Sequence, residues 1–96
     1  MTAIVGICTL DVQIPDSQSL KRKRQVIRSL KAQVRNAFNV SIAEVGHLDS
    51  WQLSTIAFCY VSTDAGHVHG LLEKVVRFVE GKRLDLVLLD YDTELV

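Results

Sequence analysis

The sequence predicts an α+β fold in which a four-stranded antiparallel sheet carries two helices on one face. Four short segments are rich in apolar and β-branched residues, and two longer segments repeat apolar residues at helical spacing. They follow one another as strand, helix, strand, strand, helix, strand, which is the ferredoxin-like βαββαβ pattern. Right-handed crossovers then place both helices on the same side of the sheet.

The first strand and the first helix have clear boundaries. Residues 3–14 are apolar with partial alternation and end at Pro15, which favours a strand. Ser17 or Ser19 is a suitable N-cap for a helix over residues 20–38, where apolar residues recur three and four positions apart.

The rest of the chain supplies three strands and one helix. Residues 40–45 and 51–61 are two strands joined by a short polar loop. Asp64 caps a second helix that closes at Gly81, and residues 84–95 form the last strand.

Length and composition indicate one domain over residues 1–96, since 48% of the residues are apolar and fill one modest core. The formal net charge of zero argues against a protein that coats nucleic acid along its whole surface. We find neither a signal-peptide pattern nor an apolar run long enough to span a membrane, so we expect a cytoplasmic protein with no membrane partner. Cys8 and Cys59 are then two buried, reduced thiols.

The most informative local feature is a basic stripe on the first predicted helix. At 100° per residue five cations fall within an arc of about 80° beside the apolar face, and no acid lies on that helix. We therefore predict a nucleic-acid-binding surface that contacts the phosphates of RNA, on the ribosome or elsewhere. Its residues are Lys21, Arg24, Arg28, Lys31 and Arg35.

Two structural explanations compete with binding. Charge runs are often solvated faces. The stripe could also pair, within the monomer or between subunits, with an acidic group near the C-terminus that comprises Asp85, Asp90, Asp92 and Glu94.

The helix-free face of the predicted sheet is a second candidate surface. Both alternation sets of the first and third strands are apolar, so the pattern does not decide which set faces the helices. An apolar open face favours a homo-oligomer. We assign Ile56, Phe58 and Tyr60 to this interface, and base stacking by Phe58 and Tyr60 is a weaker alternative because the other features of RNA-recognition sheets are missing.

The sequence shows no group of residues typical of an enzyme active site. We expect no catalytic residues, metal, cofactor or small-molecule substrate, because the chain lacks a phosphate-binding glycine loop, a nucleophile elbow and zinc-spaced ligands. His67 and His69 are two residues apart on a helix and do not share a side of it. Trp51 is expected to close one end of the core, with an exposed binding aromatic as the alternative.

Three ordered blocks resemble the YlxP-like family of small bacterial proteins. They are Ser19–Arg24, Phe38–Gly46 and Asp49–Gln52, and the likeness covers nearly the whole chain. One departure is Arg22, where the family commonly has glutamate, so this helix is more basic than in its relatives.

The resemblance implies a ferredoxin-like fold and no assigned activity. Family genes often lie beside those for a translation initiation factor and a ribosome-binding assembly factor. This neighbourhood implies an association with the ribosome or RNA and supplies no catalytic residues.

Overall fold

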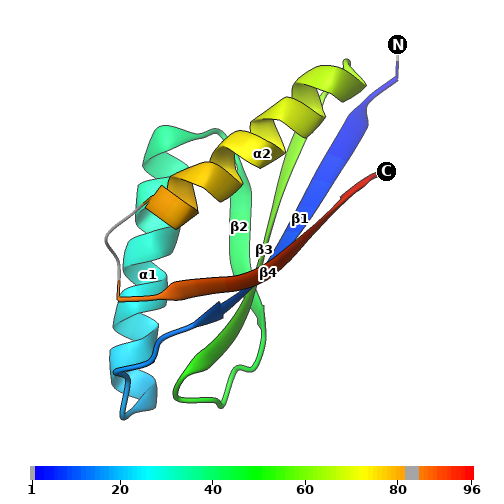
Figure 1. Cartoon of the computed structure of the whole chain (residues 1–96). Coiled ribbons are helices and arrows are strands. Elements are labelled where there is room, and N and C mark those ends of the chain that lie inside the picture. Colours follow the sequence, from blue (N-terminus) through cyan, green and yellow to red (C-terminus); the bar gives the residue numbers. More distant parts are fainter. Residues whose placement is uncertain (1, 82–84) are drawn as a thin grey trace.

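The computed structural model describes residues 2–81 and 85–96 and confirms the predicted order of elements (Figure 1). The elements are β1 (Ile4–Gln13), α1 (Leu20–Ala37), β2 (Ser41–Gly46), β3 (Leu53–Ser62), α2 (Ala65–Gly81) and β4 (Val87–Leu95). Most predicted boundaries lie within two residues of these. The predicted start of the last strand, Leu84, lies outside the described residues, and β4 begins at Val87.

The four strands form one antiparallel sheet in the order β2-β3-β1-β4. The long strands β1 and β3 pair along their whole length at the centre, from Ile4 opposite Ser62 to Gln13 opposite Leu53. The β1–β4 register shifts between Asp11 and Val12. This topology makes β2 and β4 the edge strands, and it confirms the ferredoxin-like fold class.

Side-chain caps begin both helices. The Ser19 hydroxyl accepts a hydrogen bond from the Arg22 backbone N–H at 3.0 Å, so Ser19 is the N-cap of α1. Ser17, the other candidate, donates its hydroxyl to the Ser19 carbonyl at 3.0 Å and so supports the cap. The Asp64 carboxylate accepts the His67 backbone N–H at 2.9 Å at the start of α2, as predicted.

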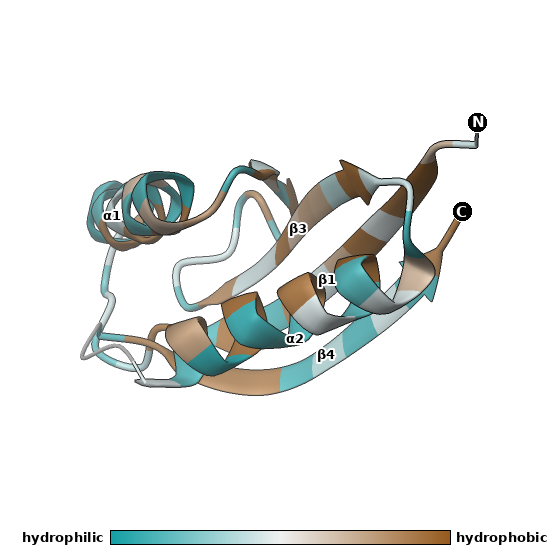
Figure 2. Ribbon diagram, turned by 90° about the horizontal axis from the view of Figure 1, so that it is seen from above, coloured by the Kyte–Doolittle hydropathy of each residue, from teal (hydrophilic) through white to brown (hydrophobic). Residues whose placement is uncertain are grey.

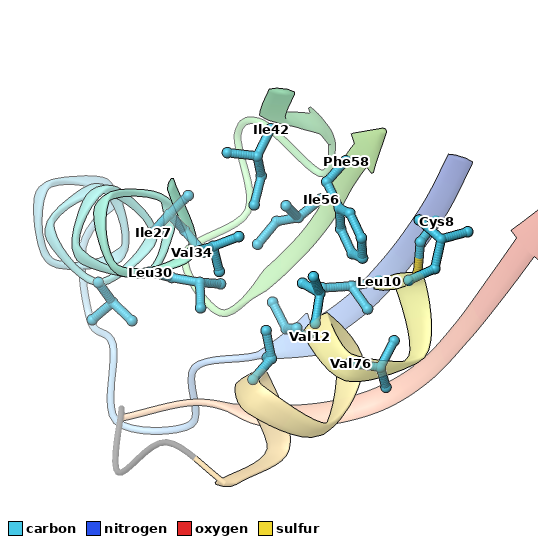
Figure 3. Packing of buried hydrophobic residues seen from close by; sticks show 14 of the residues in the cluster. Cys8, Leu10, Val12, Ile27, Leu30, Val34, Ile42, Ile56, Phe58 and Val76 are labelled. Atoms are coloured by element: carbon cyan, nitrogen blue, oxygen red, sulfur yellow. The ribbon is translucent and has the colours of Figure 1, made fainter. Parts of the chain in front are cut away.

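The core lies between the two helices and one face of the sheet (Figure 3). Even-numbered residues of β1, β2 and β3 point into it, together with the apolar sides of α1 and α2. Gly6 lets α2 approach β1 closely, because a Cβ atom at this position would overlap the Val68 side chain and lie 2.8 Å from Leu72 Cδ1. The buried apolar residues are Cys8, Leu10, Val12, Ile14, Val26, Ile27, Leu30, Val34, Ile42, Ile56, Phe58, Val68, Leu72, Val75, Val76 and Val79.

This arrangement decides which strand face meets the helices, and it overturns one prediction. Ile56 and Phe58 are 0% and 1% exposed, so they belong to the core and cannot form an interface on the open face. Tyr60 is half-buried on the same side and its hydroxyl lies 2.9 Å from His67 Nε2 on α2. The open face instead carries the other alternation set of β3, with Ala57 and Cys59 at its centre.

Neither α1 nor α2 is both long and apolar enough to cross a bilayer.

Candidate nucleic-acid interface

The five residues of the predicted basic stripe lie on the outer side of α1. The side of the helix next to the stripe is buried through Val26, Ile27, Leu30 and Val34, so the helix is fixed in orientation by its apolar side. Lys21, Arg24, Arg28 and Arg35 are exposed and Lys31 is half-buried. The helical spacing therefore places the stripe on the surface as predicted.

No stripe residue forms an ion pair with a carboxylate in residues 2–81 or 85–96. One of them, Arg35, donates a hydrogen bond of 3.0 Å to the backbone carbonyl of Ile42. The positive charge of the stripe is therefore not neutralised by a direct carboxylate contact within the described structure.

The acidic C-terminal group does not serve as the stripe's intramolecular partner. Its first member, Asp85, pairs with Arg22, which lies outside the stripe. The other three acids lie opposite Asp11, Thr9 and Ile7 of β1, on the sheet face away from the helices. The interpretation that the stripe pairs with these acids inside the monomer is therefore wrong.

Three stripe residues converge beside the edge strand β2. Arg24, Arg28 and Lys31 line a hollow of about 120 Å³, together with Ile27 and the Glu44 side chain. Glu44 is already engaged, because its carboxylate accepts the Ser54 hydroxyl at 2.7 Å and pairs with Lys23 at 3.0 Å. The three cations around the hollow thus have no carboxylate of their own, and an oxyanion would find several donors there.

Lys23 differs from the stripe although it lies between Lys21 and Arg24. Its side chain is 0% exposed. Besides the Glu44 ion pair, Nζ donates to the backbone carbonyls of His47 at 2.7 Å and Leu53 at 3.0 Å. These three oxygens match the three donors of a lysine ammonium. Lys23 therefore ties α1 to both ends of the loop between β2 and β3.

Further hydrogen bonds hold that loop, residues 47–52, against the rest of the fold. The Gln52 side-chain amide donates to the Pro15 and Ser17 carbonyls at 3.2 Å each. The Ser50 hydroxyl accepts the Leu53 backbone N–H at 3.0 Å. Trp51 is 55% exposed on this loop, so the prediction that it closes the core is wrong, and the alternative of an exposed aromatic fits the structure.

Comparison with known proteins places this geometry in a family. The profile described as "Protein of unknown function (DUF503)" matches residues 5–93. The chain belongs to this family. The uncharacterized protein YlxP of Bacillus subtilis (strain 168) is 34% identical over 77 residues, which cover 80% of this chain and 84% of that protein. The YlxP-like resemblance is therefore confirmed.

Solved structures similar to this DUF503 member show the fold alone. The de novo designed protein Foldit4 has a TM-score of 0.52 at 12% identity, covering 99% of this chain and 97% of the design. LarC2, the C-terminal domain of a cyclometallase involved in the synthesis of the NPN cofactor of lactate racemase, also has a TM-score of 0.52, at 10% identity. The match covers 99% of this chain and 56% of that one.

The two cysteines of this DUF503 member occupy opposite faces of the sheet. Cys8 is buried in the core, and burial, followed by the nearby carboxylates of Glu73 and Asp92, raises the pKa of its thiol to about 12. Cys59 is half-buried on the open face, so the prediction of two buried thiols holds for Cys8 alone. Both are free thiols.

Sequence reasoning missed the role of Lys23, although a signal was present. Lys23 precedes Val26 and Ile27 by three and four residues, which places it on the apolar side of the helix. A lysine at such a position calls for a buried acceptor. Glu44, the one acid in the second predicted strand, was the available carboxylate.

Proposed function

We propose that this protein is a non-enzymatic RNA-binding module that contacts phosphates through the basic stripe of α1. The observation that carries the proposal is a row of five surface cations that make no carboxylate contact in the described chain. The hollow among Arg24, Arg28 and Lys31 could bind one phosphate group. The ribosome association implied by the family resemblance makes ribosomal RNA the first probe.

The position of the cations along α1 supports binding over simple solubility. A helix N-terminus carries partial positive charge, so cations there are unfavourable and acids favourable. The first turn of α1 contains no acid, while Lys21, Arg22, Lys23 and Arg24 lie at this end. Lys23 is used inside the fold and Arg22 pairs with Asp85. An anionic ligand would relieve the charge that Lys21 and Arg24 add at this unfavourable position.

The proposed mode of binding differs from that of RNA-recognition sheets. Those sheets stack bases on aromatic residues of the open face. Here Phe58 is buried under the helices and Tyr60 points to the same side. Binding through α1 would position RNA by its backbone, and we expect little sequence selectivity from the stripe itself.

The test is a titration of the purified protein with a labelled single-stranded ribosomal-RNA fragment at several salt concentrations. Five phosphate contacts predict a log–log salt slope of about −3.5. The variant Arg24→Glu/Arg28→Glu leaves the half-buried Lys31 in place, and we expect it to lower affinity at least roughly tenfold and bring the slope to about −2.

The matched control is Lys74→Glu/Arg77→Glu, which changes the net charge equally but acts on exposed residues of α2. It should retain most of the affinity, and circular dichroism should show both variants folded. Equal losses in the two variants would mean that net charge alone attracts the RNA. Absence of binding at low salt would contradict the proposed function altogether.

A further inference from the structure

The open face of the sheet differs in charge from the helical layer. None of the four strands contains Lys or Arg, and every Lys and Arg in residues 2–81 and 85–96 lies on α1 or α2. The open face has both apolar and acidic parts, and Figure 2 shows hydrophilic residues along the second half of β4 where β1 and β3 are mainly hydrophobic. The two layers of the molecule therefore present different surfaces.

The apolar part of the open face is a shallow depression over β2, β3 and β1. It has a volume of about 240 Å³ and is lined mainly by small apolar side chains. Val45 at its rim is 56% exposed, and Val61 further along β3 is 59% exposed. The open-face residues that line it are Ile7, Ser41, Ala43, Val45, Ala57 and Cys59.

The acidic part runs down β4 and the neighbouring end of β1. The strand register places Asp90 opposite Asp11, and Asp92 and Glu94 follow on the same face. Asp11 accepts the Thr55 hydroxyl at 2.9 Å. Within the described ranges 2–81 and 85–96, none of these four carboxylates forms an ion pair. We call them the acidic column.

The depression and the acidic column belong to the same cross-strand rows. One row runs from Ala43 through Ala57 and Thr9 to Asp92. Neighbouring strands are about 4.8 Å apart, so β3 and β4 are separated by roughly 10 Å, which is about the diameter of a helix with its side chains. A helical segment lying over the depression could reach the carboxylates with lysine or arginine side chains.

From this charge complementarity we infer that the open face binds a basic amphipathic polypeptide segment of another protein. Its apolar side fills the depression, and its Lys or Arg side chains meet Asp90, Asp92 and Glu94. The acidic column repels nucleic acid, so this partner is distinct from the RNA proposed for α1. The protein would then join an RNA on its helical layer to a basic protein on its sheet.

A second copy of the chain fits the open face less well. A partner copy that offered the same face would fill the depression, but the carboxylates of both copies would then share an interface to which neither sheet contributes a cation. A partner copy that offered α1 would bring cations, but none of the described exposed large hydrophobic residues lies on α1.

Cys59 provides a direct probe because it lines the depression. We would measure its alkylation by iodoacetamide at about pH 8 by intact mass, with and without a synthetic amphipathic helix of leucine and lysine. Cys8 is the internal reference, because it is buried and its pKa of about 12 keeps it protonated. The leucine–lysine peptide should slow Cys59 alkylation several-fold, less so as salt is added, while a leucine–glutamate peptide should not.

The charge dependence is tested with Asp90→Asn/Asp92→Asn/Glu94→Gln, which should raise the concentration of lysine peptide needed for half-maximal protection roughly tenfold. The control Asp16→Asn/Asp49→Asn/Glu80→Gln neutralises three exposed acids elsewhere and should leave protection unchanged. The variant Arg24→Glu/Arg28→Glu should also retain protection, so this inference and the RNA proposal can fail separately.

Three results would overturn the inference. Equal protection by the glutamate peptide, or equal loss in the two neutralised variants, would show that the acidic column does not select the partner. The third result is protection of Cys59 that rises with protein concentration without any peptide, together with a dimer in sedimentation that Ala57→Glu converts to a monomer. It would show that a second copy of the chain covers the open face.

Discussion

The two sides of helix α1 both carry lysine, and they use it differently. Lys21 is exposed and forms no ion pair within the described chain. Lys23, two residues later, is fully buried and bonded to three oxygens. Neighbouring cations in a sequence can therefore have different roles. Those that lie off the apolar side of the helix form a charged surface, whereas one that lies on the apolar side is buried and becomes part of the core structure.

The difference is one of solvation. Removing an ammonium group from water costs several kcal/mol, which an ion pair and hydrogen bonds must offset. At Lys23 the Glu44 carboxylate and two loop carbonyls do so, and Ser54 holds Glu44 in place. Lys21 stays in water and is free to exchange its hydration for a phosphate.

The sharpest test of this comparison is Lys23→Met. It leaves the Glu44 carboxylate, whose side chain is only 15% exposed, without its cation, and both loop carbonyls lose a donor. We expect a loss of about 3–5 kcal/mol in the free energy of unfolding, measured by urea denaturation followed by circular dichroism. Lys21→Met should change stability by less than about 0.5 kcal/mol.

Two further measurements complete this test. Adding Glu44→Gln to Lys23→Met should recover part of the loss, because the unpaired charge is removed. RNA affinity should show the opposite order, because Lys21→Met removes an exposed cation of the stripe whereas Lys23→Met removes a buried one. Similar stability losses for the two lysine variants would contradict the division of α1 into a buried and an exposed side.

The sequence predicted the arrangement of elements because local patterns carry that information. Caps at Ser19 and Asp64, and the apolar spacing of α1, placed both helices correctly. The face of β3 was not predictable in the same way, since Phe58 and Cys59 both belong to apolar alternation sets. The structure decides it because α1 and α2 cover the side on which Ile56 and Phe58 lie.

The site was partly predictable for a related reason. Helical geometry alone places the stripe, so its residues could be found from spacing. The partner of Lys23 could not, because the contacts with Glu44, His47 and Leu53 depend on how β2 and β3 pack against α1. The size of Trp51 favours a place in the core, but the hydrogen bonds of the loop around it hold this part of the chain on the surface.

A smaller effect is expected at the N-terminus of α1, where the buried and exposed sides share one cap. Ser19→Ala removes the acceptor of the Arg22 backbone N–H and should cost about 1 kcal/mol of unfolding free energy. Ser19→Asp should retain or exceed the wild-type stability, because a carboxylate also offsets the cations of the first turn.

The control for this cap is Ser29→Ala, on the exposed side of the same helix. Its hydroxyl accepts the Gln33 side-chain amide in an exposed contact, so urea denaturation should show a change within about 0.5 kcal/mol. If Ser29→Ala and Ser19→Ala were equally costly, the cap would not be what stabilises this end of α1.

The smallest expected effect concerns Arg22, which belongs neither to the core nor to the stripe. Its guanidinium pairs with Asp85, and the two side chains are 45% and 59% exposed. Exposed pairs contribute about 0.2–1 kcal/mol, so Arg22→Ala should be near the lower end of that range. A double-mutant cycle with Asp85→Ala isolates the pair energy, which should fall further in high salt. A coupling near 3 kcal/mol would place Arg22 with Lys23 as a structural cation, whereas a coupling near zero together with weaker RNA binding would add it to the stripe.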